Sequence, residues 1–239
     1  MKVLVRWTMV MLMLIWANGV FASPTVFDQS SVTAATIGAL NISDFVIAED
    51  FTVSSTVTLT GLRVWLADAR LTSDNGVLDN FGGTLSWAIF ANSAGSPGTL
   101  LASGFDATPV LTDTGFNGTG GTVAGDVVTA DLDLGGPTLA PGTYWLGLHE
   151  GTWASAYDGS VIFWYPTLAG FGSTAHSNSD EVSLADPWQE AVVPNNTFET
   201  AFRLSGDVVQ PVPEPTTMIL LGSGLIGLAG YGRKKFFKK

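Results

Sequence analysis

A short acidic stretch at residues 74–80 carries the side chains that bind hard cations. It reads Asp-Asn-Gly-Val-Leu-Asp-Asn and offers two carboxylates, Asp74 and Asp79, together with two amides. Carboxylate, amide and backbone oxygens are the ligands that Ca²⁺ prefers. The stretch lacks the spacing of an EF-hand loop, so an ordinary acidic turn is the alternative to a calcium site. Asp74 and Asp79 are the candidate ligands for calcium, and no other cofactor is expected.

Histidine and serine residues do not form a recognisable catalytic arrangement. The chain has 2 histidines, His149 beside Glu150 and His176 in a stretch rich in Ser and Asn. A serine hydrolase would present its nucleophile on a Gly-x-Ser-x-Gly elbow, and the sequence contains none. Scattered triad residues without such a motif do not indicate catalysis.

Paired carboxylates are the other catalytic possibility, because glycoside hydrolysis needs two of them on either side of the scissile bond. The acidic pairs Glu49-Asp50 and Asp180-Glu181 are adjacent in the chain. Neighbours in a strand point to opposite faces, so neither pair would flank a substrate. We therefore predict that the chain is not an enzyme and keep a surface glycoside hydrolase as the third alternative.

Large aromatic residues are concentrated in one third of the chain, namely Trp145, Trp153, Trp164, Tyr165 and Trp188. Trp145 alternates with Tyr144 and Leu146, so it should face away from the core side of its strand. An exposed indole ring can stack on a sugar ring, which makes Trp145 and Trp153 candidates for carbohydrate binding. The alternative is that these rings pack on the second side of a sheet, where large aromatics are also common.

Short runs rich in Val, Thr, Leu, Phe and Trp, separated by Gly, Asn, Asp and Pro, indicate an all-β domain. We expect strands at residues 45–53, 56–67, 84–92, 100–105, 126–134, 142–149, 160–164 and 197–206. Residues 92–101 are typical of a hairpin loop, and residues 139–146 of a turn that feeds a central strand. Alternating apolar residues within several of these runs predict a two-sheet antiparallel β-sandwich of jelly-roll type.

The composition excludes several classes of protein. The Cys count is 0, which rules out disulfides, thiolate metal sites and a cysteine nucleophile. Between residues 23 and 210 there are 20 acidic residues and three basic ones, Arg63, Arg70 and Arg203, which gives a formal charge of −17. A surface this acidic should not bind nucleic acid. It favours solubility and could attract divalent cations or basic partners.

The first 22 residues have the three parts of a secretory signal peptide. Lys2 and Arg6 supply the positive region, residues 7–16 the apolar region, and Ala22 the small residue before the cleavage site. Signal peptidase is expected to cut between Ala22 and Ser23. The apolar run is shorter than the 18 or more residues of a membrane span, so an uncleaved anchor is the less favoured interpretation.

The last 29 residues combine three features in a fixed order. A tripeptide, Pro213, Glu214 and Pro215, precedes an apolar segment at residues 216–232. A basic cluster then ends the chain, formed by Arg233, Lys234, Lys235, Lys238 and Lys239. Seventeen helical residues span roughly 26 Å, which predicts a single transmembrane helix. The basic cluster should remain cytoplasmic, which places the preceding domain on the other side of the membrane.

This order of tripeptide, glycine-rich apolar helix and basic cluster resembles the PEP-CTERM sorting signal. The resemblance implies recognition by exosortase, a membrane-embedded protease, in a host that exports exopolysaccharide. Residues 92–101 and 139–146 are also similar to stretches of the β-sandwich ectodomains of such proteins. We thus expect a signal peptide at 1–22, a β-sandwich at 23–210 and a sorting tail at 211–239.

The resemblance implies an exported protein that the tail anchors transiently in the inner membrane before it reaches the cell surface or the extracellular matrix. A structural or adhesive role is the leading functional expectation. A lectin-like module that binds exopolysaccharide is the second alternative.

Overall fold

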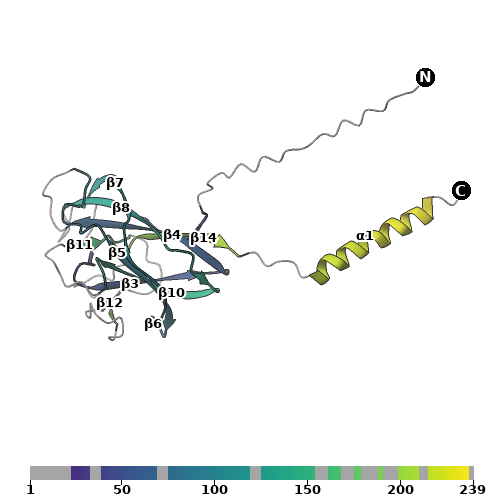
Figure 1. Cartoon of the computed structure of the whole chain (residues 1–239), viewed down its shortest axis with the longest axis horizontal. Coiled ribbons are helices and arrows are strands. Elements are labelled where there is room, and N and C mark those ends of the chain that lie inside the picture. The colour runs from purple at the N-terminus through teal and green to yellow at the C-terminus, as the bar shows by residue number, and fades with distance from the viewer. Residues whose placement is uncertain are drawn as a thin grey trace, which may run out of the picture.

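A computed structural model describes residues 23–32, 39–68, 75–118, 125–153, 161–167, 175–178, 188–190, 199–209 and 215–236. Within these residues the chain forms two antiparallel sheets that pack face to face, followed by a helix that lies apart from them (Figure 1). The predicted signal peptide at 1–22 lies outside the described residues.

The first sheet has six strands. Their order is β13 (Gln189–Glu190), β12 (His176–Asn178), β3 (Val46–Val53), β10 (Gly142–Glu150), β5 (Leu85–Ser93) and β6 (Ser96–Ala107). The turn that joins β5 to β6 consists of Ala94 and Gly95, both with positive φ. Two consecutive residues with positive φ form the tight turn that matches the twist of a hairpin.

The second sheet has eight strands and is organised around the long strand β4 (Val57–Asp68). The main path runs β1 (Thr25–Gln29), β14 (Phe202–Val208), β4, β11 (Ile162–Trp164) and β2 (Leu40–Asn41). The other edge of β4 pairs with β8 (Asp126–Asp133) and β9 (Thr138–Leu139), and β8 pairs in turn with β7 (Val110–Asn117).

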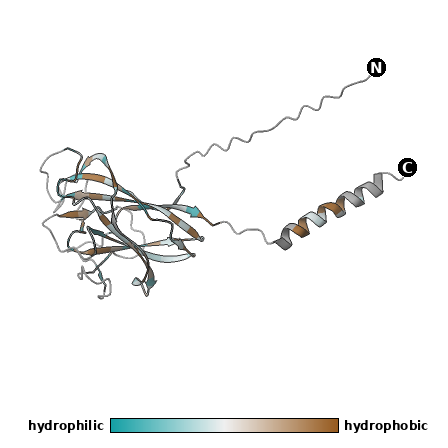
Figure 2. Ribbon diagram, in the orientation of Figure 1, coloured by the Kyte–Doolittle hydropathy of each residue, from teal (hydrophilic) through white to brown (hydrophobic). Residues whose placement is uncertain are grey.

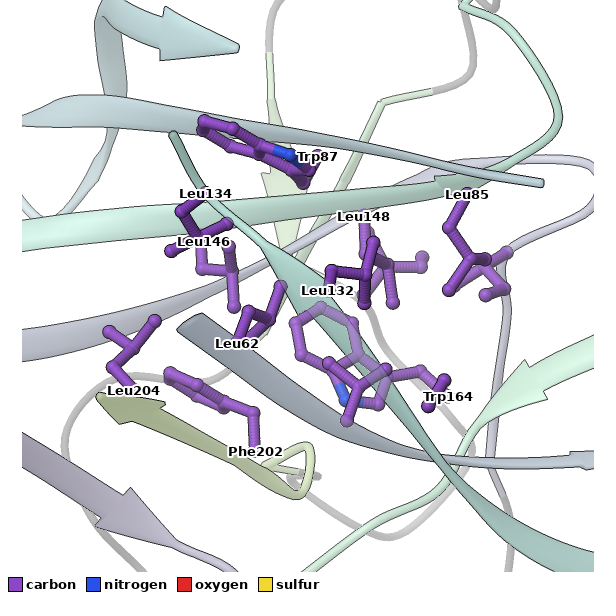
Figure 3. Close-up of a cluster of buried hydrophobic side chains, with 14 of the residues drawn as sticks. Leu62, Leu85, Trp87, Leu132, Leu134, Leu146, Leu148, Trp164, Phe202 and Leu204 are labelled. Atoms are coloured by element: carbon purple, nitrogen blue, oxygen red, sulfur yellow. The ribbon is translucent and has the colours of Figure 1, made fainter. Parts of the chain in front are cut away.

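The main core lies between the two sheets and is made of alternate residues from their strands. Figure 3 shows part of it, with Leu62, Leu85, Trp87, Leu132, Leu134, Leu146, Leu148, Trp164, Phe202 and Leu204 gathered between the ribbons. The alternation predicted within several runs is observed: Leu85, Trp87 and Ile89 contact this core, and so do Tyr144, Leu146 and Leu148. Two smaller apolar clusters cover the outer faces of the sheets.

The two-sheet antiparallel sandwich is confirmed, and the jelly-roll connectivity stays a prediction. Each expected strand overlaps an observed one, although the last begins at Phe202 instead of residue 197. The expected loop at 92–101 is wrong for most of its length, since β6 already begins at Ser96. The turn before β10 is confirmed, and β10 lies in the interior of its sheet between β3 and β5.

Helix α1 (Pro215–Phe236) coincides with the apolar segment and the start of the basic cluster. The apolar side chains described in it are exposed, with Ile219, Leu220, Leu225 and Ile226 between 60% and 76% accessible, and the helix shows brown stretches separated by a pale one in Figure 2. In the part of the chain that the structure describes, no helix combines the length and the apolar character that a membrane crossing requires. The transmembrane helix expected from the sequence is therefore not confirmed.

Candidate functional site

The sorting tail is partly described. Pro215 is the first residue of α1, and Arg233, Lys234 and Lys235 belong to its last turns. Pro213, Glu214, Lys238 and Lys239 lie outside the described residues, as does Ala22 of the predicted cleavage site. Ser23 is described and half-buried, and the carbonyl of the next residue, Pro24, accepts a hydrogen bond from Gly206 N–H at 2.9 Å. The cleavage and sorting sites stay predictions.

Trp145 faces away from the inter-sheet core, as predicted, but it is not exposed. It belongs to the apolar cluster on the outer face of the six-stranded sheet, with Phe90 and Trp153, and its exposed fraction is 0%. Its indole N–H donates to Asn92 Oδ1 at 3.0 Å, and its ring meets the ring of His176 edge-on, 4.6 Å between centroids. A ring held on all sides offers no free face for a sugar.

Trp153 is also buried, with an exposed fraction of 6%. Its ring lies 6.0 Å from the ring of His149, centroid to centroid. Both tryptophans are buried, so the alternative, in which these rings pack on the second side of a sheet, describes both. Sugar stacking at these positions stays a prediction without structural support.

His149 is fully buried beneath the same outer face. Neither ring nitrogen has a hydrogen-bond partner among the described residues, so one N–H donor is left unsatisfied in either tautomer. Burial lowers the pKa of His149, and the nearby Asp44 carboxylate opposes that shift. A neutral, enclosed imidazole is a poor surface base, because a general base must reach its substrate within hydrogen-bond distance.

The structure describes Glu49 and Asp50 of the acidic pairs considered for glycosidase chemistry, and Glu150 beside His149. Glu49 and Asp50 lie on opposite faces of β3. Glu49 is two positions from the core residue Phe51 and points to the same side, whereas Asp50 points to the outer side. Glu150 accepts hydrogen bonds from Ser43 Oγ and from Gly82 N–H, the latter at 2.8 Å. Asp180 and Glu181 lie outside the described residues.

Glu49 is the most unusual of these acids, because it is fully buried between the sheets. Its Oε2 accepts hydrogen bonds from Thr200 N–H at 2.7 Å and from Thr200 Oγ1 at 3.2 Å. Gln29 donates from Nε2 to the carbonyl of the same Thr200 at 3.1 Å. Burial raises the pKa of Glu49 well above its usual range, so the carboxyl group is held toward its neutral form.

Residues 75–77 of the acidic stretch fold around a carboxylate that the sequence analysis did not include. Asp126 Oδ2 accepts hydrogen bonds from three consecutive backbone N–H groups, those of Asn75, Gly76 and Val77, at 3.2, 3.0 and 3.3 Å. Gly76 has a φ of 72°, which lets the backbone curl around this oxygen. Three amides on one anion form a nest that holds the turn in place.

Asp68 ends β4 directly below this turn and is 2% exposed. Its Oδ2 accepts the Asp79 N–H at 2.7 Å, while Oδ1 has no hydrogen-bond partner among the described residues. Burial, followed by the charges of Asp79 and Asp126, raises the pKa of Asp68 to about 6. Sequence reasoning missed Asp68 and Asp126, although each sits at the end of a strand, where side chains meet loops.

These acids do not form a preassembled metal centre in the described chain. Within the ranges given above, no group of three or more His, Cys, Asp or Glu side chains is placed to hold a metal ion. Asp79 is exposed, and Asp74, the other candidate ligand, lies outside the described residues. Asp68 and Asp126 both accept hydrogen bonds from backbone N–H groups of the turn, and the calcium site stays a prediction.

Comparison with known proteins identifies the tail and not the sandwich. A family model described as the PEP-CTERM protein-sorting motif matches residues 211–234, which include the tripeptide, the apolar segment and Arg233. No curated protein sequence matches the chain. The predicted resemblance is confirmed for these residues, and the motif implies processing by exosortase. The chain is therefore a β-sandwich protein with a carboxy-terminal PEP-CTERM motif, the signal by which exosortase sorts exported proteins.

Proposed function

We propose that this chain is a non-enzymatic surface protein whose β-sandwich has a structural or adhesive role at the cell surface or in the extracellular matrix. The observation that carries this proposal is the sorting motif at 211–234, which directly follows the last strand of a sandwich with a large closed core. A folded domain attached to a sorting tail is cargo for export, and its own surface then determines what it does outside.

Export proceeds in three steps under this proposal. Residues 1–22 direct the chain to the secretory pathway, and signal peptidase removes them before Ser23. The apolar side chains of α1, exposed in the described chain, then meet the lipid of the inner membrane. Exosortase acts near Pro213, Glu214 and Pro215, whose two prolines favour an extended, non-helical backbone that a protease cleft can accept.

The state of the potential catalytic groups supports a role without catalysis. His149 is enclosed, and His176 packs against Trp145. Glu49 is buried in the core. The carboxylate of Glu150 accepts hydrogen bonds from both Ser43 Oγ and Gly82 N–H, which links these two segments. These groups are buried or hydrogen-bonded within the sandwich.

The sorting half of the proposal is tested by replacing Pro213, Glu214 and Pro215 with alanine in the native host. We expect export across the inner membrane to continue while the variant accumulates there, because the tripeptide and not the signal peptide directs sorting. Cell fractionation and the intact mass of the surface or released protein provide the measurement. Asp207→Asn, an exposed change outside the motif, is the control. Normal amounts of surface protein with an unchanged carboxy terminus in the triple variant would refute the proposal.

A further inference from the structure

Four charged residues form a straight row across the outer face of the eight-stranded sheet. They occupy directly paired positions on β1, β14, β4 and β8, in the order Asp28, Arg203, Arg63 and Asp131. All four point outward, because the residues on either side of the two arginines and of Asp131 belong to the inter-sheet core. Two of the three basic residues between positions 23 and 210 thus lie side by side on neighbouring strands.

The order of charges in this row is not the one that ion pairing alone would favour. In an alternating row, neither arginine would have the other as a direct neighbour. Here Arg203 and Arg63 are direct cross-strand partners, and like charges in that position destabilise a sheet. The arrangement concentrates positive charge at the centre of the row and keeps the carboxylates of Asp28 and Asp131 at its ends.

The two end carboxylates hold the guanidinium groups in fixed positions. Arg63 donates from Nε and Nη2 to the two oxygens of Asp131, at 2.7 Å each. Arg203 donates from Nε to Asp28 Oδ2 at 3.0 Å and from Nη2 to Ser30 Oγ at 3.1 Å. These hydrogen bonds use two of the five N–H donors of each guanidinium group. Two anchored guanidinium groups with unused donors are prepared to bind an acceptor.

A hollow lies beside this row because the neighbouring positions carry small side chains. Thr25, Ser205 and Gly61 are paired across β1, β14 and β4. Ser205 and Gly61 lie two residues from Arg203 and Arg63 on their strands. The pairing of β14 with β4 is irregular between Ser205 and Gly206, which marks a β-bulge at this point. Because glycine has no side chain, Gly61 contributes only backbone to the floor of a groove of about 320 Å³. The lining of this groove also includes Arg63, Arg203 and Ser205.

The groove selects for a particular chemistry. Its centre offers guanidinium donors, which bind a carboxylate through short charge-assisted hydrogen bonds. Its margins offer Asp131 as an acceptor and the hydroxyl groups of Thr25 and Ser205, which exchange hydrogen bonds with alcohols. From this geometry we infer that the groove binds a polyhydroxylated carboxylate, of which a uronic acid unit, free or within a polysaccharide, is the chemical type.

This inference goes beyond the proposed sorting and structural role, because binding at the groove does not depend on the tail. The formal charge of −17 over residues 23–210 makes the surroundings repel anions. An acidic ligand is therefore favoured where the positive groups of Arg63 and Arg203 are concentrated. The side chains of Arg63 and Arg203 are 40% and 35% exposed, so a ligand can reach them.

The test measures binding of sodium glucuronate to the purified full chain by isothermal titration calorimetry at low ionic strength. Glucose has the hydroxyl groups without the carboxylate, and acetate has the carboxylate without the hydroxyl groups. We expect glucuronate to bind at least tenfold more tightly than either. Arg63→Gln and Arg203→Gln should each weaken binding about tenfold, as expected when one charge-assisted hydrogen bond is lost. Thr58→Ala, on the same face but outside the groove, should not change it.

Substitutions at Gly61, on the floor of the groove, distinguish a loss of ligand binding from a loss of folding. A Cβ added at Gly61 would lie 3.7 Å from Ser205 Cβ and 3.8 Å from the Leu132 carbonyl oxygen, which is ordinary contact. Gly61→Ala should thus keep or raise the melting temperature while weakening glucuronate binding, and Gly61→Val should abolish binding.

An oligomer of galacturonic acid distinguishes the two sources of the ligand. Binding of the oligomer but not of the monomer, with the same dependence on Gly61 and the arginines, would support the inference and make the polysaccharide the source. Equal binding of glucuronate, glucose and acetate would overturn it. So would wild-type affinity in Gly61→Val, or binding of neither the monomer nor the oligomer.

Discussion

Replacing Asp68 by asparagine should stabilise the sandwich at neutral pH. Asp68 is 2% exposed, and one of its oxygens, Oδ1, has no hydrogen-bond partner among the described residues. In Asp68→Asn the amide oxygen can still accept the Asp79 N–H. The amide N–H₂ group would take the place of the unpartnered oxygen, in the negative field of Asp79 and Asp126. The change therefore removes a buried charge and adds a donor where one is favoured.

The size of the effect follows from the pKa. Burial raises the pKa of Asp68 from 3.8 to about 6, a shift of about two units, and each unit corresponds to 1.36 kcal/mol, so the shift represents up to about 3 kcal/mol. Because the folded state has the higher pKa, this stability is fully present below pH 3.8 and is lost as the pH rises through 6. Asp68→Asn should match the wild type near pH 4 and exceed it by about 2 to 3 kcal/mol at pH 7.5.

Urea unfolding of both proteins between pH 4 and pH 8 measures this directly, and thermal unfolding should show a difference of roughly 4 to 12 °C at pH 7.5. Asp207→Asn, an exposed change in β14, controls for the general effect of lowering the negative charge. Asp68→Ala, which also removes the acceptor for Asp79 N–H, should be less stable than Asp68→Asn by about 1 kcal/mol. An equal pH dependence in wild type and Asp68→Asn would refute the assignment of the buried charge to Asp68.

Three further outcomes are expected. Glu49→Gln should retain an acceptor for Thr200 N–H and lose the fall in stability that the raised pKa of Glu49 produces as the pH rises; urea unfolding at pH 5 and pH 8 tests this, and a variant less stable than wild type at both would contradict it. If residues 74–80 bind calcium, a hundredfold excess over the dissociation constant should stabilise the protein by roughly 2.7 kcal/mol, and the double change Asp74→Asn with Asp79→Asn should abolish the gain, whereas equal effects of magnesium and calcium would indicate general screening. A fragment of residues 23–210 should be a soluble, mostly β monomer by circular dichroism and gel filtration, and insolubility without the tail would contradict the domain boundaries.

The sequence predicted the parts of the fold that short-range patterns encode. Strand β10 shows this well, since the alternation of Tyr144, Leu146 and Leu148 correctly identified its core face. Strands β2, β12 and β13 were not predicted, because two or three residues are too few to display a period. Strand β7 was missed for another reason, as most of its residues are exposed or half-buried and carry little apolar signal.

The candidate sites were harder to predict because their members come from distant parts of the chain. Trp145 was correctly oriented, but the residues that bury it, such as His176, follow about 30 positions later on another strand. Asp126 lies about 50 positions from the turn that it organises. Arg63 and Arg203 are paired only because β14 returns to β4 at the end of the domain. Local patterns contain no information about such register, which depends on how the whole sheet is assembled.

The pairing of β14 with both β1 and β4 determines how the domain would carry mechanical force. A protein held by its carboxy-terminal tail transmits tension first into β14, the last strand before the tail. That strand is hydrogen-bonded on both edges, and antiparallel hydrogen bonds lie perpendicular to the strand. Tension along β14 therefore loads many bonds at once in shear instead of opening them one at a time. The groove ligand would attach to the same strands, so the path of tension from ligand to tail would run through β14 and leave the six-stranded sheet unloaded.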